Sequence, residues 1–207
     1  MSQRFLLILM ALLFTSGPII SQASHHEDLS QEVSHHYAHN KDVKIHYVKA
    51  GSGPLVVMVH GFPDYWYSWR HQMNGLKKDF TVVAMDQRGY NRSDQPDGVE
   101  SYAMHNLVSD VIAVIRDTGA TQATVVGHDW GGAVAWQVAF NAPEVVQNLV
   151  ILNLPHPNGM ARELANNPEQ QRNSAYARRF IEGSAEDPDI MFGGPMNPQT
   201  LARWVQD

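Results

Sequence analysis

The chain has 207 residues, 43% of them hydrophobic and 17% charged, which suits one globular domain. Its 15 basic and 21 acidic residues leave a net charge of −6, and no basic run occurs, so nucleic acid is not an expected partner. The absence of cysteine excludes disulfides, thiol nucleophiles and metal sites built on thiolates.

The N-terminus has the pattern of a secretory signal peptide. Arg4 precedes an apolar run at 5–14, and the small-residue site Ser21-Gln22-Ala23 follows. We therefore expect residues 1–23 to be removed and the mature chain to be exported from a bacterial cell, to the periplasm or the medium. The apolar run is shorter than the ~20 residues that span a bilayer, so no stable membrane association is expected after cleavage. An uncleaved anchor or a buried first helix is the alternative.

A polar stretch rich in histidine follows at residues 24–36. It resembles a metal-binding tract, but no carboxylate and histidine share a helix at a ligand spacing. We interpret the stretch as a solvated linker and expect no metal site. Residues 34–38 and 43–49 are then predicted to form a hairpin that turns at Asn40-Lys41-Asp42.

Short apolar strands and helices alternate along the next part of the chain. The predicted strands are 55–59, 80–85, 123–126 and 148–154, and the predicted helices are 68–76, 107–115 (closed by Gly119) and 133–140. Continuous apolar strands that alternate with helices indicate an α/β fold with a mostly parallel, doubly wound sheet covered on both faces.

Polar residues follow four of these strands. They are His60, Asp86, Asp129 and Asn153. Because ligands bind at the carboxyl ends of strands in such sheets, we expect the four side chains to cluster at one edge. From residue 156 onward, prolines and glycines break the pattern and leave short helical pieces at 160–164 and 176–181. We interpret 24–155 as part of the core and 156–207 as the start of a cap over that edge.

The segment Gly127-His128-Asp129-Trp130-Gly131-Gly132 joins the strand at 123–126 to the helix at 133–140. Glycine, x, nucleophile, x, glycine between a strand and a helix is the pattern of a nucleophile elbow, a turn too tight for Cβ atoms beside the nucleophile. Here the nucleophile position holds aspartate. An ionised carboxylate needs no base to attack carbon, and it forms an ester with the enzyme, which points to substrates with an electrophilic sp³ carbon. A helix N-cap is the alternative role for Asp129.

This elbow, together with His60-Gly61-Phe62-Pro63 and the block 86–94, resembles the α/β-hydrolase superfamily. Within it the chain resembles the branch of epoxide hydrolases and haloalkane dehalogenases, whose nucleophile is aspartate. The block 86–94 has Asn91 where the family usually has glycine, a mild change because asparagine tolerates positive φ. The resemblance implies an α/β-hydrolase fold without a cofactor and a small-molecule substrate, either an epoxide or an organohalide.

The resemblance also implies roles for individual residues. Asp129 is the expected nucleophile, and the backbone N–H groups of Phe62 and Trp130 are the expected oxyanion hole. His60 is expected to hydrogen-bond backbone near the elbow rather than to act as a base, and Pro63 is a candidate for a cis peptide bond. The other residues expected to shape the pocket are Gly61, Gly127, His128 and Gly131.

Tyr176-Ala-Arg-Arg-Phe180 resembles the Tyr-x-x-x-Phe of the epoxide hydrolase cap, whose tyrosine points at the nucleophile. Opening an epoxide produces an alkoxide, and a neutral phenol is a suitable donor to it; simple packing of Tyr176 on a cap helix is the alternative. Tyr176 and Phe62 favour the hydrolysis of epoxides to diols. The rival functions are a haloalkane or haloacid dehalogenase, with Trp130 donating to the halide, and a non-catalytic ligand-binding protein on the same scaffold.

The family completes its catalytic set with a histidine and an acid in the C-terminal half. The last histidine of this sequence is His156, where the family commonly has Pro-His-Pro before the cap. We therefore expect an N-terminal portion of a longer hydrolase, with the C-terminal part of the core missing, that alkylates Asp129 without full turnover. The strand at 149–154 is then expected to leave an open apolar edge that favours aggregation.

Overall fold

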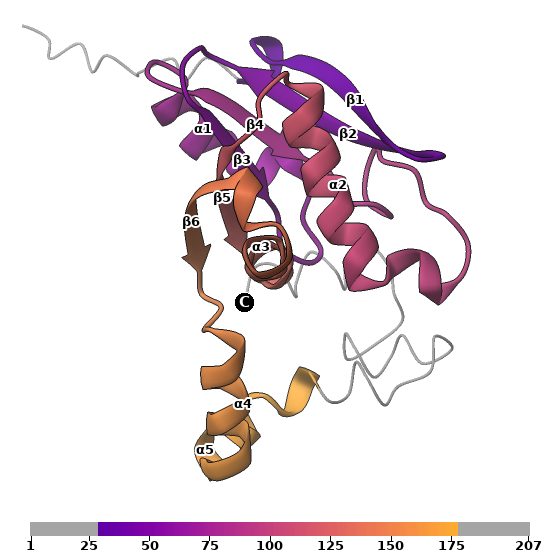
Figure 1. Ribbon diagram of the computed structural model, residues 1–207. Helices are drawn as coiled ribbons and strands as arrows, with labels where there is room; N and C mark the ends of the chain where they lie inside the picture. The colour runs from indigo at the N-terminus through magenta and orange to yellow at the C-terminus, as the bar shows by residue number, and fades with distance from the viewer. Residues whose placement is uncertain (1–28, 178–207) are drawn as a thin grey trace, which may run out of the picture.

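A sheet of six strands in the order β1-β2-β4-β3-β5-β6 forms the centre of the molecule (Figure 1). The computed structural model describes residues 29–177, so the predicted signal peptide lies outside the described residues. The strands are β1 Ser34–Asn40, β2 Val43–Ala50, β3 Leu55–Val59, β4 Thr81–Met85, β5 Ala123–His128 and β6 Val146–Leu152. β2 runs antiparallel to β1 and β4, whereas β3 is parallel to β4 and β5, and β5 to β6. The mostly parallel α/β sheet predicted from the sequence is confirmed.

The helices alternate with the parallel strands as predicted. They are α1 Arg70–Leu76, α2 Met104–Asp117, α3 Trp130–Asn141, α4 Pro157–Asn166 and α5 Pro168–Asn173, with 3₁₀ turns η1 Leu29–Gln31, η2 Trp66–Trp69, η3 Val99–Tyr102 and η4 Pro143–Val145. The helix expected from residue 68 begins two residues later, because η2 precedes it. The last strand begins at Val146 rather than Asn148 and ends before Asn153, whose φ of 56° turns the chain out of the sheet.

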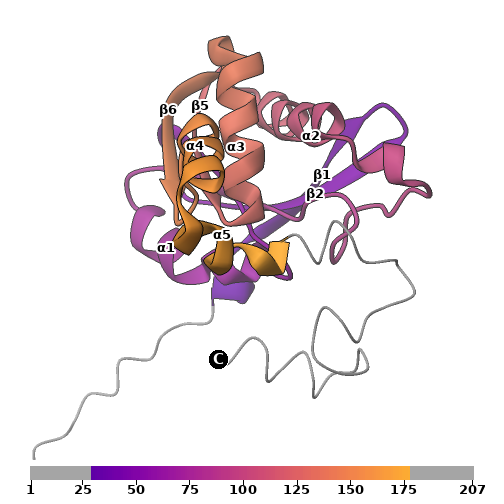
Figure 2. The same cartoon turned by 90° about the horizontal axis from the view of Figure 1, so that it is seen from below.

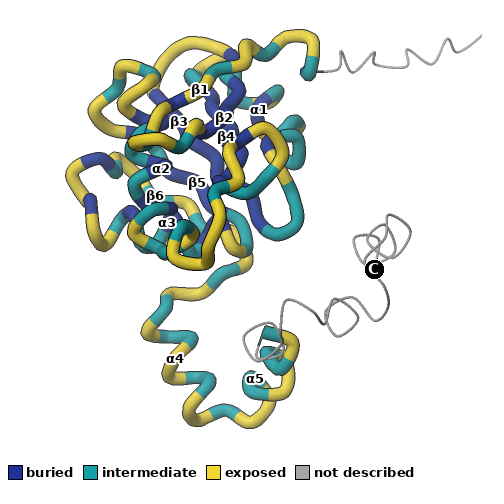
Figure 3. The backbone as a smooth tube through the Cα atoms, turned by 90° about the vertical axis from the view of Figure 1, so that its right-hand side faces the viewer, coloured by how far each residue is buried: buried dark blue, intermediate teal, exposed yellow. Residues whose placement is uncertain are grey.

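The central strands β3 and β4 are buried on both faces of the sheet. Every residue of β3 is buried, and successive side chains pack into two different clusters. Val57 and Val59 join the cluster under α2 and α3, whereas Val56 and Met58 join the cluster under η2 and α1. Figure 3 accordingly shows buried backbone in the centre of the molecule, around the middle strands of the sheet. Burial of each such side chain contributes about 1.5–3 kcal/mol to folding, and the sheet therefore positions its strand ends rigidly.

A buried ion pair fastens the loop after β4 to α2. Arg88 donates from Nε and Nη2 to the two carboxylate oxygens of Asp110, both at 2.6 Å, and its Nη1 reaches the carbonyl of Ser101, also at 2.6 Å. The two charged side chains are only 4% and 1% exposed, so each depends on the other for the interactions that water would otherwise supply.

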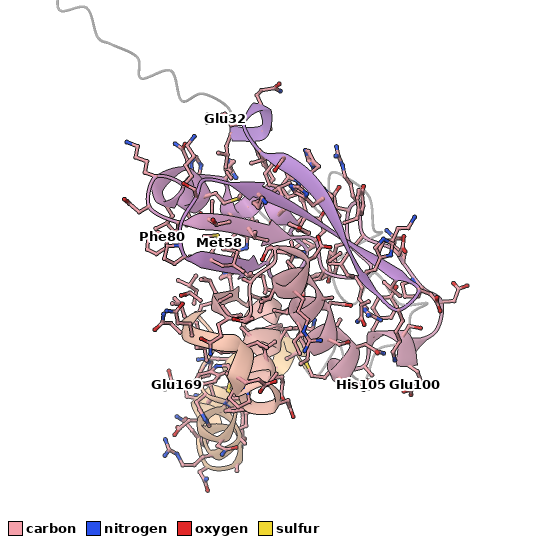
Figure 4. The ribbon with its side chains drawn as sticks, turned by 45° about the horizontal axis from the view of Figure 1, so that its top comes forward. Glu32, Met58, Phe80, Glu100, His105 and Glu169 are labelled. Carbon is pink, nitrogen blue, oxygen red and sulfur yellow. The ribbon has the colours of Figure 1, made fainter. Side chains whose placement is uncertain are left out.

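The segment after β6 leaves the body of the molecule. Figures 1 and 3 show α4 and α5 extending away from the sheet, and in Figure 4 Glu169 of α5 lies at the far end of the molecule from Glu32. Neither helix contains a buried residue, and α5 is not predicted from the sequence. Within residues 29–177, no helix is both long enough and apolar enough to span a bilayer.

β6 is the outermost strand of the sheet in the described part of the chain. Its Val150 and Leu152 side chains are 43% and 42% exposed. Within residues 29–177 no strand pairs with the outer side of β6, and the effect of this edge on aggregation stays a prediction.

Candidate active site

The carboxyl ends of the parallel strands bring the predicted polar residues together (Figure 2 shows the sheet and α3 from below). The loop after β3 reaches the end of β5, because the Phe62 N–H donates to Asp129 Oδ1. The end of β5 reaches the end of β6, because the Asp129 N–H donates to Asn153 Oδ1. The loop after β4 closes the arrangement through the Gln87 N–H, which donates to His60 Nε2. The predicted cluster at one edge of the sheet is confirmed.

Asp129 lies on a sharp, strained turn. Its φ of 50° and ψ of −122° are unusual for any residue with a Cβ atom and cost about 1–3 kcal/mol. The flanking glycines make this turn possible, because a Cβ on Gly127 would lie 2.4 Å from the Gly131 oxygen and one on Gly131 would lie 2.3 Å from the Val59 oxygen. The tight packing of α3 against β3 and β5 therefore fixes the backbone that carries Asp129.

The carboxylate of Asp129 faces the loop after β3 and does not cap α3. Its Oδ1 accepts the Phe62 N–H at 3.0 Å, whereas the helix begins with no side-chain cap hydrogen bond and uses the Asp129 carbonyl to accept from the Gly132 N–H at 2.8 Å. The alternative role as an N-cap is therefore wrong. The Phe62 N–H is thus directed at Oδ1 of the carboxylate.

The loop that supplies the Phe62 N–H is shaped by its neighbours. The Phe62–Pro63 peptide bond is cis, as the sequence suggested. Gly61 is buried, and a Cβ at this position would lie 2.6 Å from the Asp129 Cβ. Only glycine lets the loop approach Asp129 so closely.

His60 supports this loop through backbone groups. Since the Gln87 N–H donates to Nε2 at 3.0 Å, the ring proton is on Nδ1, which donates to the Gly61 carbonyl at 2.8 Å. Burial lowers the pKa of His60, although the Gly61 carbonyl opposes the shift. The imidazole is neutral, and both of its nitrogens are hydrogen-bonded to backbone groups. This arrangement suits a structural role and does not suit a general base.

The remaining predicted site residues lie around this centre. Trp130 is the first residue of α3 and is 47% exposed, and the half-buried His128 packs edge-on against Trp69 at 6.5 Å between ring centroids. Tyr176 lies in the segment after α5 with 60% of its surface exposed. Its proposed approach to Asp129 stays a prediction, and the rest of the helical piece expected at 176–181 lies outside the described residues.

Two features of the site were missed by the sequence analysis. Tyr90 packs edge-on against His60 at 5.0 Å, and burial together with the nearby charge of Asp129 raises its pKa. Asn153 was expected at the edge of the sheet, but the hydrogen bond that it accepts from the Asp129 N–H was not expected. Because Tyr90 belongs to the block 86–94 that resembles the family, its sequence position could have indicated that it lies near the site.

Asp86 is fully buried and organises the loops on either side of it. It accepts hydrogen bonds from His46 Nδ1 at 2.6 Å, the Trp66 N–H at 2.9 Å and Asn91 Nδ2 at 2.8 Å. Burial alone would raise the pKa of Asp86, but the hydrogen bond from His46 and its other donors hold it below its usual value. Asn91 has a φ of 44°, which explains why asparagine can replace glycine there.

No group of three or more histidine, aspartate or glutamate side chains within residues 29–177 is arranged to hold a metal ion. A surface hollow lined by Gly53, Thr81, Gly119 and Gln122 lies at the opposite ends of the strands and contains none of the predicted site residues.

Comparison with known proteins agrees with this arrangement. Residues 54–200 match a family model described as the alpha/beta hydrolase fold. The chain is 40% identical over 147 residues to Epoxide hydrolase 4 of Mus musculus, covering 69% of this chain and 41% of that protein. It is 41% identical over 147 residues to AB hydrolase superfamily protein YfhM of Bacillus subtilis (strain 168), covering 70% of this chain and 51% of that protein.

Among solved structures, the chain resembles a mutant epoxide hydrolase from Bacillus megaterium complexed with its product (R)-3-[1]naphthyloxy-propane-1,2-diol. The TM-score is 0.75 at 41% sequence identity, over 83% of this chain and 59% of that one. This chain therefore spans about half the length of the relatives that it matches.

Proposed function

Because the chain belongs to the α/β-hydrolase fold family, we propose that its described residues form the nucleophilic half of an enzyme that hydrolyses epoxides to diols. The observation that carries the proposal is the carboxylate of Asp129, presented on the elbow with Oδ1 held by the Phe62 N–H. The names of the relatives support the substrate class, since the Bacillus megaterium structure holds a diol product.

In the first step Oδ2 of Asp129 attacks an epoxide carbon. A carbon–oxygen ester bond forms while the ring carbon–oxygen bond breaks, and its electron pair stays on the epoxide oxygen as an alkoxide. The alkoxide takes a proton from a neutral donor, a role we assign to the Tyr176 hydroxyl. This step consumes no water and leaves the whole epoxide attached to the enzyme.

In the second step water adds to the ester carbonyl carbon. The negative charge develops on Oδ1, which already accepts the Phe62 N–H, and we assign the second donor to the Trp130 N–H. One such donor contributes about 2.7–4 kcal/mol to stabilisation of the transition state. Collapse of the intermediate breaks the bond to the alkyl oxygen, which takes a proton from the base that deprotonated the water and leaves as the diol. The new carboxylic acid gives its proton to the phenolate left by the first step, so the carboxylate is restored and one water is consumed.

The water of the second step must lose a proton to a base. His60 is committed to backbone groups, and His156 accepts the Asn158 N–H at Nδ1 while its ring packs against Trp136 at 4.9 Å. Neither imidazole suits this role. The described residues therefore support formation of the ester, the first half of the reaction.

The test is the covalent adduct. We expect incubation with styrene oxide to increase the intact mass by one whole epoxide, with the modification on the peptide that contains Asp129. Asp129→Asn keeps the acceptor for the Phe62 N–H but removes the nucleophile, and should remain unmodified. No adduct on the wild-type chain would contradict the proposal. An adduct formed only from an alkyl halide, with release of halide, would favour a dehalogenase instead.

We also propose that the protein is exported. The support is the signal-like pattern at residues 1–23, with its small-residue site ending at Ala23. N-terminal sequencing of the chain recovered outside the cytoplasm should begin at Ser24, and recovery of only the uncleaved chain from the cytoplasm would contradict export.

A further inference from the structure

We propose that Asn153 is a positioning residue for the nucleophile, which it holds through the backbone N–H of Asp129. This inference rests on the proposed function and adds a residue that acts on Asp129 from the neighbouring strand. The contact joins Asn153 Oδ1 to the Asp129 nitrogen at 3.0 Å.

Asn153 lies just past the end of the β5–β6 pairing, where a side chain can accept the Asp129 N–H. The ladder between β5 and β6 ends with the pair His128 and Leu152, so the Asp129 N–H is the first donor past the regular pairing. The Leu152 carbonyl is 3.4 Å from that nitrogen, which is long for a hydrogen bond. Asn153 Oδ1, at 3.0 Å, is a closer acceptor for this N–H than the last carbonyl of β6.

The backbone of Asn153 makes this contact possible. Its φ is 56°, a left-handed conformation that asparagine adopts more readily than most residues with a side chain. Asp129 has a similar φ of 50°. The chain thus turns out of the sheet at two neighbouring strand ends, and the hydrogen bond ties one turn to the other.

Asparagine also suits the chemistry better than its closest isostere. The amide oxygen accepts without a charge, so it leaves the carboxylate of Asp129 free of a second negative charge. Aspartate at position 153 would accept the same N–H but place a carboxylate beside the nucleophile. Two neighbouring carboxylates retain a proton to higher pH than one does, and a protonated Asp129 does not attack.

The experiment follows two independent readouts on the full chain: the rate of adduct formation with styrene oxide, and the hydrogen exchange of the Asp129 amide by NMR. Asn153→Ala should slow adduct formation by about fivefold and accelerate amide exchange. Asn153→Asp should retain slow exchange but form the adduct only at higher pH than wild type. Asn148→Ala is the matched control, because it removes another side-chain hydrogen bond between β6 and β5, to Thr124, outside the site.

The outcomes separate this inference from the proposed function. Unchanged amide exchange in Asn153→Ala overturns the role of Asn153, whether or not adducts form. Adduct formation by Asn153→Ala within about twofold of wild type overturns it also, because each tenfold change corresponds to about 1.4 kcal/mol and a net hydrogen bond is worth about 1 kcal/mol. If the wild-type chain forms no adduct, the nucleophile proposal fails, while the exchange data still decide whether Asn153 holds the elbow.

Discussion

Substitution of Gly131 by alanine should destabilise the protein by a mechanism specific to the elbow. The added Cβ would lie 2.3 Å from the Val59 oxygen, 2.4 Å from the His60 oxygen and 2.6 Å from the Val59 carbonyl carbon. These atoms belong to backbone at the end of a fully buried strand, so no flexible side chain can move aside. Overpacking of this kind costs about 3 kcal/mol, the upper part of its usual range. For a domain of this size, we expect the melting temperature to fall by about 6–12 °C.

The assay is thermal unfolding followed by far-UV circular dichroism, with Gly75→Ala as the matched control. Gly75 lies in α1 with open space where a Cβ would be built, so alanine there should stabilise by about 0.5–1 kcal/mol through helix propensity. The two glycine-to-alanine changes are thus expected to have opposite signs. If Gly131→Ala melts within about 2 °C of the wild-type protein, the close approach of α3 to β3 does not restrict this position and the reasoning is refuted.

Three further predictions concern ionisable side chains. Asp110→Ala should lower the free energy of unfolding, measured by urea titration, by about 3–5 kcal/mol, because it leaves Arg88 buried and unpaired. Glu163→Ala removes one partner of an exposed ion pair and should change the same free energy by less than about 1 kcal/mol. Burial and a hydrogen bond to a carboxylate raise the pKa of Tyr47, so stability should be lost as pH rises above about 10, and Tyr47→Phe should lack that loss; equal slopes would contradict this. Burial and the neighbouring His46 imidazole lower the pKa of His35, so on acidification the unfolded chain binds this proton at a higher pH than the folded chain does. The free energy of unfolding should therefore fall as the pH drops below about 6.5, and it should fall less steeply in His35→Gln.

The fold was predictable from the sequence because its signals are local. The run 55–59 is apolar at every position and is a fully buried strand, and the glycines around Asp129 indicate a turn that the structure contains. The strand at 146–152 was displaced by two residues in the prediction, since its apolar run continues past the point where Asn153 adopts a left-handed conformation. The hydrophobic pattern of the sequence does not indicate that turn.

The contacts of the site were less predictable because they join residues distant in sequence. The hydrogen bond of Asn153 to Asp129 spans 24 positions, and that of His46 to Asp86 spans 40. A single sequence indicates which residues follow strands, but the partner of each depends on strand order and register. The order β4-β3-β5-β6 places the ends of non-consecutive strands side by side, and only the folded sheet specifies it.

The electrostatic surroundings of Asp129 are consistent with a carboxylate used as a nucleophile. A neighbouring cation would stabilise the charged carboxylate and reduce its tendency to share an electron pair with carbon. Of the two arginines in the loop after β4, Arg88 is neutralised by Asp110, and Arg92 contacts the His35 ring. No ion pair within residues 29–177 includes Asp129, whose charge instead meets the neutral Phe62 N–H at one oxygen. In the mechanism that we propose, this donor stabilises charge on Oδ1 both before attack and when water adds to the ester. It would therefore favour the second step, and Asp129 would not have to give up a strong ion pair in the first.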